Sequence, residues 1–191
     1  MDIKEISAEF ETNLQNFHLP RSRELPDLDF YMDQVISIME KNLFMLSGDG
    51  QNKIITPAMI NNYVKLEIIP PPKKKRYSKL HICYLFIICT LKSVIPISSV
   101  TQVIKTHTEN RSIFDLYDMF CEAYENMLKR AAETAEEILY ETEVLEEALA
   151  KLSLFMAINA ATNQLIATST LKAFSDDSPQ EDTKEKEKPK K

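Results

Sequence analysis

The sequence predicts a mainly α-helical protein, in which a winged helix-turn-helix-like domain is followed by long amphipathic helices. Only Gly48 and Gly50 are glycines among 191 residues, whereas sheet-rich folds use glycine at many turns. Residues 112–174 contain neither glycine nor proline and repeat apolar side chains at helical spacing. Residues 55–77 combine a short capped helix, prolines and a basic run, the arrangement with which a winged helix meets DNA.

Residues 1–27 are predicted to form an N-terminal arm that is extended or turn-like. Pro20 and Pro26, with the alternating charges around them, disfavour a helix in this segment. Three leucines are expected to hold the arm against the body of the protein: Leu19, Leu25 and Leu28. The DNA-binding domain is expected to follow, over residues 28–108.

The first helix of that domain is predicted over residues 30–46, with Asp29 as its N-terminal cap. Six apolar residues recur there at helical spacing: Tyr31, Val35, Ile38, Met39, Leu43 and Leu46. The sequence SGDGQNK at residues 47–53 then ends the helix, and it lacks the ligand pattern of a calcium-binding loop.

A short second helix is predicted from Thr56 to about Leu66. Thr56 supplies a capping hydroxyl and Pro57 takes the first helical position, which together make a strong helix start. The inner side of this helix is expected to carry Met59, Ile60, Tyr63, Val64 and Leu66. Its outer side is expected to carry Ala58, Asn61, Asn62 and Lys65.

A basic wing is predicted to follow this helix. Pro70 to Pro72 end the helix, and Lys73 to Tyr77 are expected to form a short strand. We call residues 53–92 the basic island, because they hold eight basic residues and only one acidic residue, Glu67. The net charge of the island is about +7, whereas that of the whole chain is −6. Such an island concentrates a positive field on one face, although lysines that only keep a loop soluble are the alternative.

Two more helices complete the predicted domain. Ser78 is expected to cap a helix that runs to about Ile95 and is apolar around nearly its whole circumference, so it belongs in the middle of the core. Pro96 ends it and precedes a helix over residues 97–106. The inward residues of that helix are expected to be Val100, Val103 and Ile104.

Residues 112–174 are predicted to form one long amphipathic helix or two helices. Apolar residues alternate at spacings of four and three from Ile113 to Ala131, slip by one extra step of four towards Ile138, and resume at Leu145. Two helices packed within one subunit and a dimer built from this segment both fit, and the dimer is preferred. Residues 175–191 lack apolar side chains and are expected to be a disordered tail.

Composition predicts a soluble cytoplasmic protein. The first ten residues lack the apolar region of a signal peptide, and the longest apolar run, residues 82–95, holds about 14 residues, too few to span a bilayer. Cys83, Cys89 and Cys121 form no C-x-x-C pair, which favours buried free thiols in a reducing compartment.

Enzymatic and metal-binding motifs are absent from the sequence, so no catalysis and no cofactor are expected. His18, His81 and His107 stand far apart without a nucleophile motif, and His81 is interpreted as a surface or boundary residue. The glutamates of residues 133–147 lack the Glu-x-x-His pairs of a di-iron site and indicate a solvated helix face.

Nucleic-acid binding is better supported. Asn61 and Asn62 are expected to face bases as exposed amides, with Lys65 one turn on reaching a phosphate. Four basic residues are expected to grip the DNA backbone in a salt-sensitive way: Lys73, Lys74, Lys75 and Arg76. Ala58 and Tyr63 complete the candidate contacts, Tyr63 by packing or by touching a phosphate, while Tyr77 is expected to close the wing from the core.

These residues resemble the MerR-type winged helix. The shared features are Thr56-Pro57, Tyr63, Ile69-Pro70, the basic run 73–76, Tyr77-Ser78, a hydrophobic helix over 82–94 and Ile97 to Val100. That family usually carries Arg where Asn61 stands and Gly where Glu67 stands, which weakens a direct transfer of its DNA contacts. The resemblance implies no effector-binding residues in this chain, so the identity of a small-molecule effector stays open.

The segments LPRSRELPDLDFYMDQV and TPAMINNYVKLEIIPPPKKKRYS more closely resemble the bacterial domain of unknown function 1836, over roughly residues 15–125. That resemblance implies a DNA-binding regulator without an established target or ligand. The sequence therefore predicts a regulator that binds double-stranded DNA as a homodimer through residues 112–174, without catalysis. The alternative is a helical protein-interaction or adaptor module that does not bind DNA.

Overall fold

The computed structural model describes residues 5, 6, 8, 12, 17–44, 53–141 and 144–176. Within these residues the chain is mainly helical, as predicted, and two isolated β-bridges are the only extended pairings. The helices in chain order are α2 (Met32–Asn42), α3 (Pro57–Lys65), α4 (Lys79–Leu91), α5 (Ile97–Thr108), α6 (Ile113–Leu139) and α7 (Leu145–Asp176).

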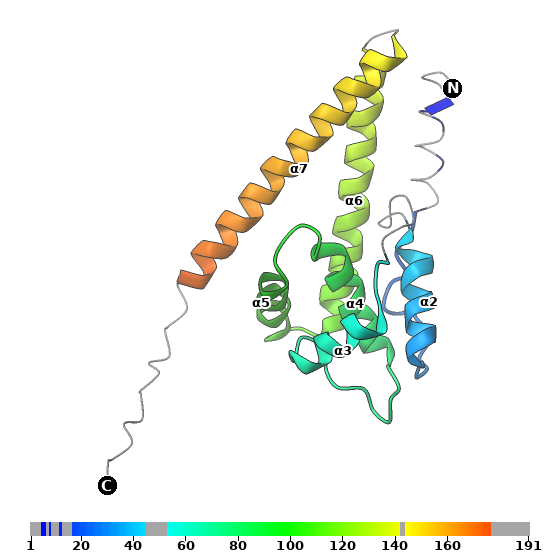
Figure 1. Ribbon diagram of the computed structural model, residues 1–191, viewed down its shortest axis with the longest axis vertical. Helices are drawn as coiled ribbons and strands as arrows, with labels where there is room; N and C mark the ends of the chain where they lie inside the picture. Colours follow the sequence, from blue (N-terminus) through cyan, green and yellow to red (C-terminus); the bar gives the residue numbers. More distant parts are fainter. Residues whose placement is uncertain are drawn as a thin grey trace.

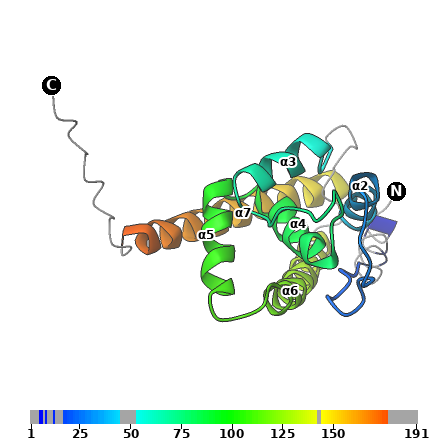
Figure 2. The same cartoon turned by 90° about the horizontal axis from the view of Figure 1, so that it is seen from below.

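Helix α4 lies at the centre of the fold and packs against α2, α5 and α6, while α3 packs against α2 (Figure 1). Helices α6 and α7 run in opposite directions and diverge away from the turn that joins them. Helix α3 and residues 66–78 lie at the end of the molecule opposite that turn. Seen from below, α3 and α5 lie on the same side of α4 as α7, whereas α6 lies on the other side (Figure 2).

The apolar circumference of α4 is buried, as predicted. Leu85, Phe86 and Ile88 are fully buried, and the ring of Phe86 packs 5.5 Å from that of Tyr117 on α6. Complete burial of each such side chain stabilises a fold by roughly 1.5–3 kcal/mol. The helix ends at Leu91, four residues before the predicted end.

Helix α2 is shorter than predicted at both ends. It begins at Met32, and its cap is Tyr31 rather than Asp29, with the Tyr31 amide donating to Gln34 Oε1 at 2.9 Å. The reason is that Phe30 pairs with Tyr77 through two backbone hydrogen bonds, which keeps it extended. Val35, Met39 and Leu43 are buried as expected, but Tyr31 is half exposed. Leu46 and most of the predicted loop lie outside the described residues.

The arm is held down less by leucines than by polar contacts. Leu19 and Leu25 are buried as expected, but Leu28 is 66% exposed, so its predicted anchoring role is wrong. Instead, Arg21 forms a two-pronged ion pair with Glu125 on α6, at 2.6 Å and 2.9 Å. The predicted arm is therefore part of the folded domain from at least residue 17.

Further hydrogen bonds extend this attachment along α6. The amide of Leu19 donates to Glu125 Oε1 at 2.9 Å, and the Tyr117 hydroxyl donates to the Pro20 carbonyl at 2.7 Å. The amide and hydroxyl of Ser22 both donate to the Asp118 carboxylate, at 2.6 Å and 2.7 Å. The arm is thus attached to one face of α6, at Tyr117, Asp118 and Glu125.

The predicted long helical region consists of two helices that pack on each other near their turn. Ser112 caps α6, with its Oγ accepting from the Asp115 amide at 3.1 Å. A second small core joins the helices: Ala135, Ile138, Leu139, Ala148 and Leu152. Met127 and Ala131, expected inward from the spacing, are exposed because α7 has already diverged from α6 there. Helix α7 continues to Asp176, beyond the predicted start of the tail, and residues 177–191 lie outside the described part.

Helix α7 presents an uncharged surface that the described residues leave exposed. Residues 152–171 contain no charged side chain, although 27% of the chain is charged. Five large apolar side chains there are exposed, by between 45% and 66%: Leu154, Phe155, Ile158, Leu165 and Ile166. We call these five residues the α7 apolar face. Exposed apolar clusters of this size mark contact surfaces more often than free ones.

All three cysteines are buried free thiols, as predicted. Burial raises the pKa of Cys83 to about 12 and that of Cys89 and Cys121 to about 11, which keeps them protonated and unreactive. The described residues contain no group of three or more His, Cys, Asp or Glu side chains placed to hold a metal ion. Among the described helices, none has the length and apolar character needed to cross a bilayer.

Candidate nucleic-acid interface

Helix α3 begins as its sequence predicts and exposes most of the predicted face. The Thr56 hydroxyl accepts from the Met59 amide at 3.2 Å, and Pro57 takes the first helical position. The predicted outer side chains are all exposed: Ala58, Asn61, Asn62 and Lys65. Ile60 is buried as expected, but Met59 and Leu66 are exposed, so the buried stripe is narrower than predicted.

Tyr63 lies in the core and is not available as a phosphate contact. Its side chain is only 6% exposed, and burial raises its pKa. The spacing of Ile60 and Tyr63 places both on the inner face of the helix, so Tyr63 packs, which is the first of the two roles predicted for it. The candidate face of α3 therefore comprises Ala58, Asn61, Asn62 and Lys65.

The end of α3 is a Schellman motif closed by a residue other than glycine. The Ile68 amide donates to the Tyr63 carbonyl at 2.9 Å, and the Glu67 amide donates to the Val64 carbonyl at 3.1 Å. Glu67 adopts φ 54°, in the left-handed region that glycine usually occupies at this point of a helix end. The motif turns the chain sharply towards the three prolines.

The predicted wing is a tight turn rather than a strand. Lys73 and Arg76 form an isolated bridge, and the Arg76 amide donates to the Lys73 carbonyl at 2.9 Å. The two central residues, Lys74 and Lys75, adopt φ 51° and 62°, as a type I′ turn requires. We call residues 73–76 the wing turn; all four of its side chains are exposed.

The base of the wing turn is attached to the start of α2. Phe30 and Tyr77 exchange backbone hydrogen bonds of 2.8 Å and 2.9 Å, and Tyr77 is buried as predicted. The Arg76 guanidinium lies 4.6 Å from the centre of the Tyr31 ring and donates to the Tyr31 hydroxyl at 2.8 Å. Tyr31 thereby holds the one arginine of the wing turn in place.

His81 supports the wing turn from below and is not a boundary residue. It is 6% exposed, its Nδ1 accepts from the Ser78 amide at 3.0 Å, and its ring meets that of Tyr77 edge-on at 5.4 Å. Burial lowers the pKa of His81. The Pro70 and Pro71 carbonyls act in the opposite direction, but burial outweighs them. The neutral ring is the form that can accept this hydrogen bond, so it links the base of the wing turn to α4.

The positive charge of the basic island is concentrated further by the fold. Lys79 lies 3.7 Å from Asp27 and above the Phe114 ring, and Lys92 donates to the Ile54 carbonyl. Within the described part of the chain, the other lysines of the island form no ion pair and are exposed: Lys53, Lys65, Lys73, Lys74 and Lys75. With Arg76, they are the exposed cations of the basic island.

The left-handed conformation of the wing turn predicts a stabilising substitution. Replacing Lys74 by Asn and Lys75 by Gly supplies the residues that a type I′ turn favours, so we expect the free energy of unfolding to rise by about 1 kcal/mol or more. Urea denaturation measures the change. The control variant, Lys74→Gln with Lys75→Gln, removes the same two charges but keeps non-glycine side chains in the left-handed conformation. If the two double variants have equal stability, the left-handed conformation does not strain the turn.

A comparison with protein families finds one match, to the family described as domain of unknown function (DUF1836), over residues 20–127. The match includes most of the described arm, helices α2 to α5 and the first half of α6, but not α7. No curated protein and no solved structure matches the chain. Apart from Leu19, the sequence motifs that carried the resemblance lie within the matched residues.

Proposed function

The chain belongs to the family described as domain of unknown function (DUF1836), and we propose that it is a DNA-binding transcriptional regulator. The observation that carries the proposal is one cationic end of an acidic chain. The exposed face of α3 and the wing turn lie at the same end of the molecule, away from the α6–α7 turn (Figure 1). This end combines amides that can read bases with cations that can hold phosphates.

In this proposal, residues 28–108 act as a winged helix-turn-helix-like domain of the MerR type. Helix α3 enters the major groove, where Asn61 and Asn62 contact base edges and the small side chain of Ala58 permits close approach. Lys65 and the wing turn contact phosphates on either side of the groove. Arg76 differs from the lysines because Tyr31 orients its guanidinium before DNA arrives.

We further propose that the protein is a homodimer joined through the α7 apolar face. Leu154, Ile158 and Leu165, with Ala161 between them, repeat at spacings of four, three and four, as in a helix-packing seam. The surface is free of charge, so two identical copies can meet without burying an unpaired ion. A dimer would present two α3 helices to two half-sites and so multiply specificity.

The exposed α7 apolar face also favours a second candidate function, an adaptor that binds a different protein through α7 without binding DNA. The two functions differ in the role of the wing turn. Only a DNA-binding protein needs the cations of the wing turn for its activity, whereas an adaptor uses them for solubility.

The direct test selects bound sequences from a random duplex pool at two salt concentrations and then measures affinity for the enriched DNA. We expect alanine at all four wing-turn residues to weaken binding strongly and to reduce the slope of log K against log salt by roughly three to four. The control variant replaces four exposed basic residues away from this end by alanine: Lys41, Lys129, Arg130 and Lys172. Equal salt slopes in the two variants, or no enrichment from the pool, would favour the adaptor.

A further inference from the structure

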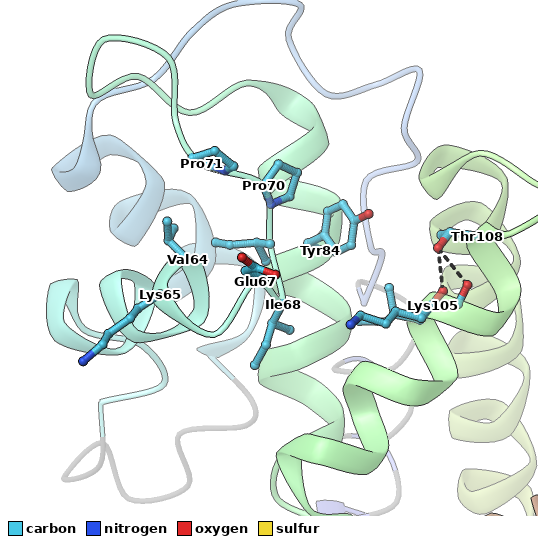
Figure 3. Close-up of a pocket in the computed structure, with 11 residues that line it drawn as sticks. Val64, Lys65, Glu67, Ile68, Pro70, Pro71, Tyr84, Lys105 and Thr108 are labelled. Atoms are coloured by element: carbon cyan, nitrogen blue, oxygen red, sulfur yellow. Dashed lines mark hydrogen bonds between the residues drawn. The ribbon is translucent and has the colours of Figure 1, made fainter. Parts of the chain in front are cut away.

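A cavity of about 570 Å³ lies behind the end of α3. It is open to solvent on one side and is lined by the last turn of α3, the segment 67–71, Tyr84 of α4 and the last turns of α5 (Figure 3). Its size falls in the range of protein sites for small molecules. Neither Asn61 nor Asn62 lines it, although Lys65, a proposed phosphate contact, does.

The floor of this cavity is apolar. Ile68, Ile69 and Ile104 are buried beneath it, and the ring of Tyr84 forms one wall. The Tyr84 hydroxyl makes no hydrogen bond within the described part of the chain, so it is free to bind a ligand. An apolar body with a polar group near Tyr84 would match this lining.

One acidic and one basic side chain point into the mouth of the cavity. Lys105 extends from α5 towards the segment that carries Glu67 (Figure 3). Lys65 also lines the cavity, but its ammonium end points away from it. Glu67 and Lys105 are both exposed and form no ion pair among the described residues. The cavity therefore offers one carboxylate and one ammonium group that the protein does not use for each other.

The backbone at Glu67 gives independent support for a role of its carboxylate. Glu67 occupies the left-handed position of the Schellman motif, where glycine would be less strained. Residues held in sparsely populated backbone conformations cluster at ligand sites. Here the strained residue is also the one that places a carboxylate at the mouth of the cavity.

We propose that this cavity binds a small zwitterion with an apolar body, of the class of aromatic or branched α-amino acids. The ligand ammonium pairs with Glu67, and its carboxylate accepts from Lys105 and the Tyr84 hydroxyl. The apolar body covers Ile68 and Ile104. The balance of one acid and one base at the mouth favours a zwitterion over a simple anion or a simple amine.

The test is isothermal titration of the full chain with L-phenylalanine and with its two single-charge analogues, phenethylamine and 3-phenylpropanoate. We expect saturable binding of L-phenylalanine and roughly tenfold weaker binding of each analogue, because each analogue leaves one charge of the cavity without its partner. Absence of saturable binding, or an analogue that binds as tightly as L-phenylalanine, would overturn the proposal.

Substitutions at Glu67 and Lys105 test whether these two side chains bind the ligand. Lys105→Met is expected to weaken L-phenylalanine binding about tenfold, whereas Lys129→Met, which removes an exposed lysine of α6 that does not line the cavity, leaves it unchanged. Glu67→Gly is expected to raise the thermal midpoint and also to weaken binding, whereas a residue with a purely structural role would change the midpoint alone. Equal affinities of the Lys105 and Lys129 variants, or full affinity of Glu67→Gly, would exclude the assigned contacts.

Discussion

Replacing Arg21 by alanine is expected to lower the free energy of unfolding by about 2–3 kcal/mol. The Arg21 and Glu125 side chains are only 21% and 24% exposed, and their ion pair is two-pronged. Loss of the guanidinium leaves Glu125 partly buried with fewer donors, which costs more than loss of a surface pair. Urea denaturation followed by circular dichroism measures the change.

Two comparisons isolate the ion pair. Arg23→Ala removes a neighbouring exposed arginine and should change stability by less than about 0.5 kcal/mol. The double variant Arg21→Ala, Glu125→Ala should lose less free energy of unfolding than the two single variants lose together. The reason is that the double variant leaves no unpaired charge. Additive losses would show that the two side chains stabilise the arm independently.

The same ion pair gives stability a defined pH dependence. Burial opposes ionisation of Glu125, but hydrogen bonds from Arg21 and the Leu19 amide outweigh it, so the pKa of Glu125 lies below its usual value. The folded state therefore binds fewer protons than the unfolded state, and this contribution is complete above the usual glutamate pKa of about 4.3. It should disappear as the pH falls through the lower pKa, and Glu125→Gln should flatten the acid limb of the stability curve.

Charges introduced into the α7 apolar face are expected to convert the proposed dimer into a monomer. Ile158→Glu combined with Leu165→Glu places four carboxylates in an uncharged dimer interface, and we expect at least a hundredfold weaker self-association. Sedimentation equilibrium over a range of concentrations measures it. The monomer itself should keep its fold, because both side chains are exposed within one chain.

The matched control adds the same charges to α7 outside its apolar face. Ser153 and Ala160 are exposed and lie seven residues apart on the other side of the same helix, so Ser153→Glu combined with Ala160→Glu should leave self-association close to that of the parent. A parent protein that remains monomeric at high concentration would contradict the homodimer and leave α7 to a different protein partner. Equal dissociation of both variants would place the interface elsewhere on the chain.

The sequence predicted correctly those features that depend on residues close to one another along the chain. The Thr56-Pro57 helix start depends on residues within one turn, and the burial of α4 follows from its own apolar circumference. The proximity of Glu67 and Lys105 was not predictable, because the whole of α4 and most of α5 separate them in the sequence. Helical periodicity also could not show where α7 leaves α6, which exposes Met127 and Ala131.

The missed residues act through contacts between distant parts of the chain. Tyr31 touches Arg76 across 45 positions, and Arg21 meets Glu125 across 104. The available signal was weak: an arginine in a charged arm, and acidic residues Asp118 and Glu125 seven apart on one helix face. Such a pattern resembles a solvated surface until the fold shows what lies against it.

The attachment of the arm to α6 has a consequence for biosynthesis. The arm leaves the ribosome before α6, because its partner Glu125 lies 104 residues after Arg21 and only two residues before the end of the family match. The nascent domain must therefore wait for almost its whole length before its first segment can dock. A fragment that ends at residue 127 should retain this closure, whereas one that ends after α5 should leave the arm and one side of α4 open to chaperones.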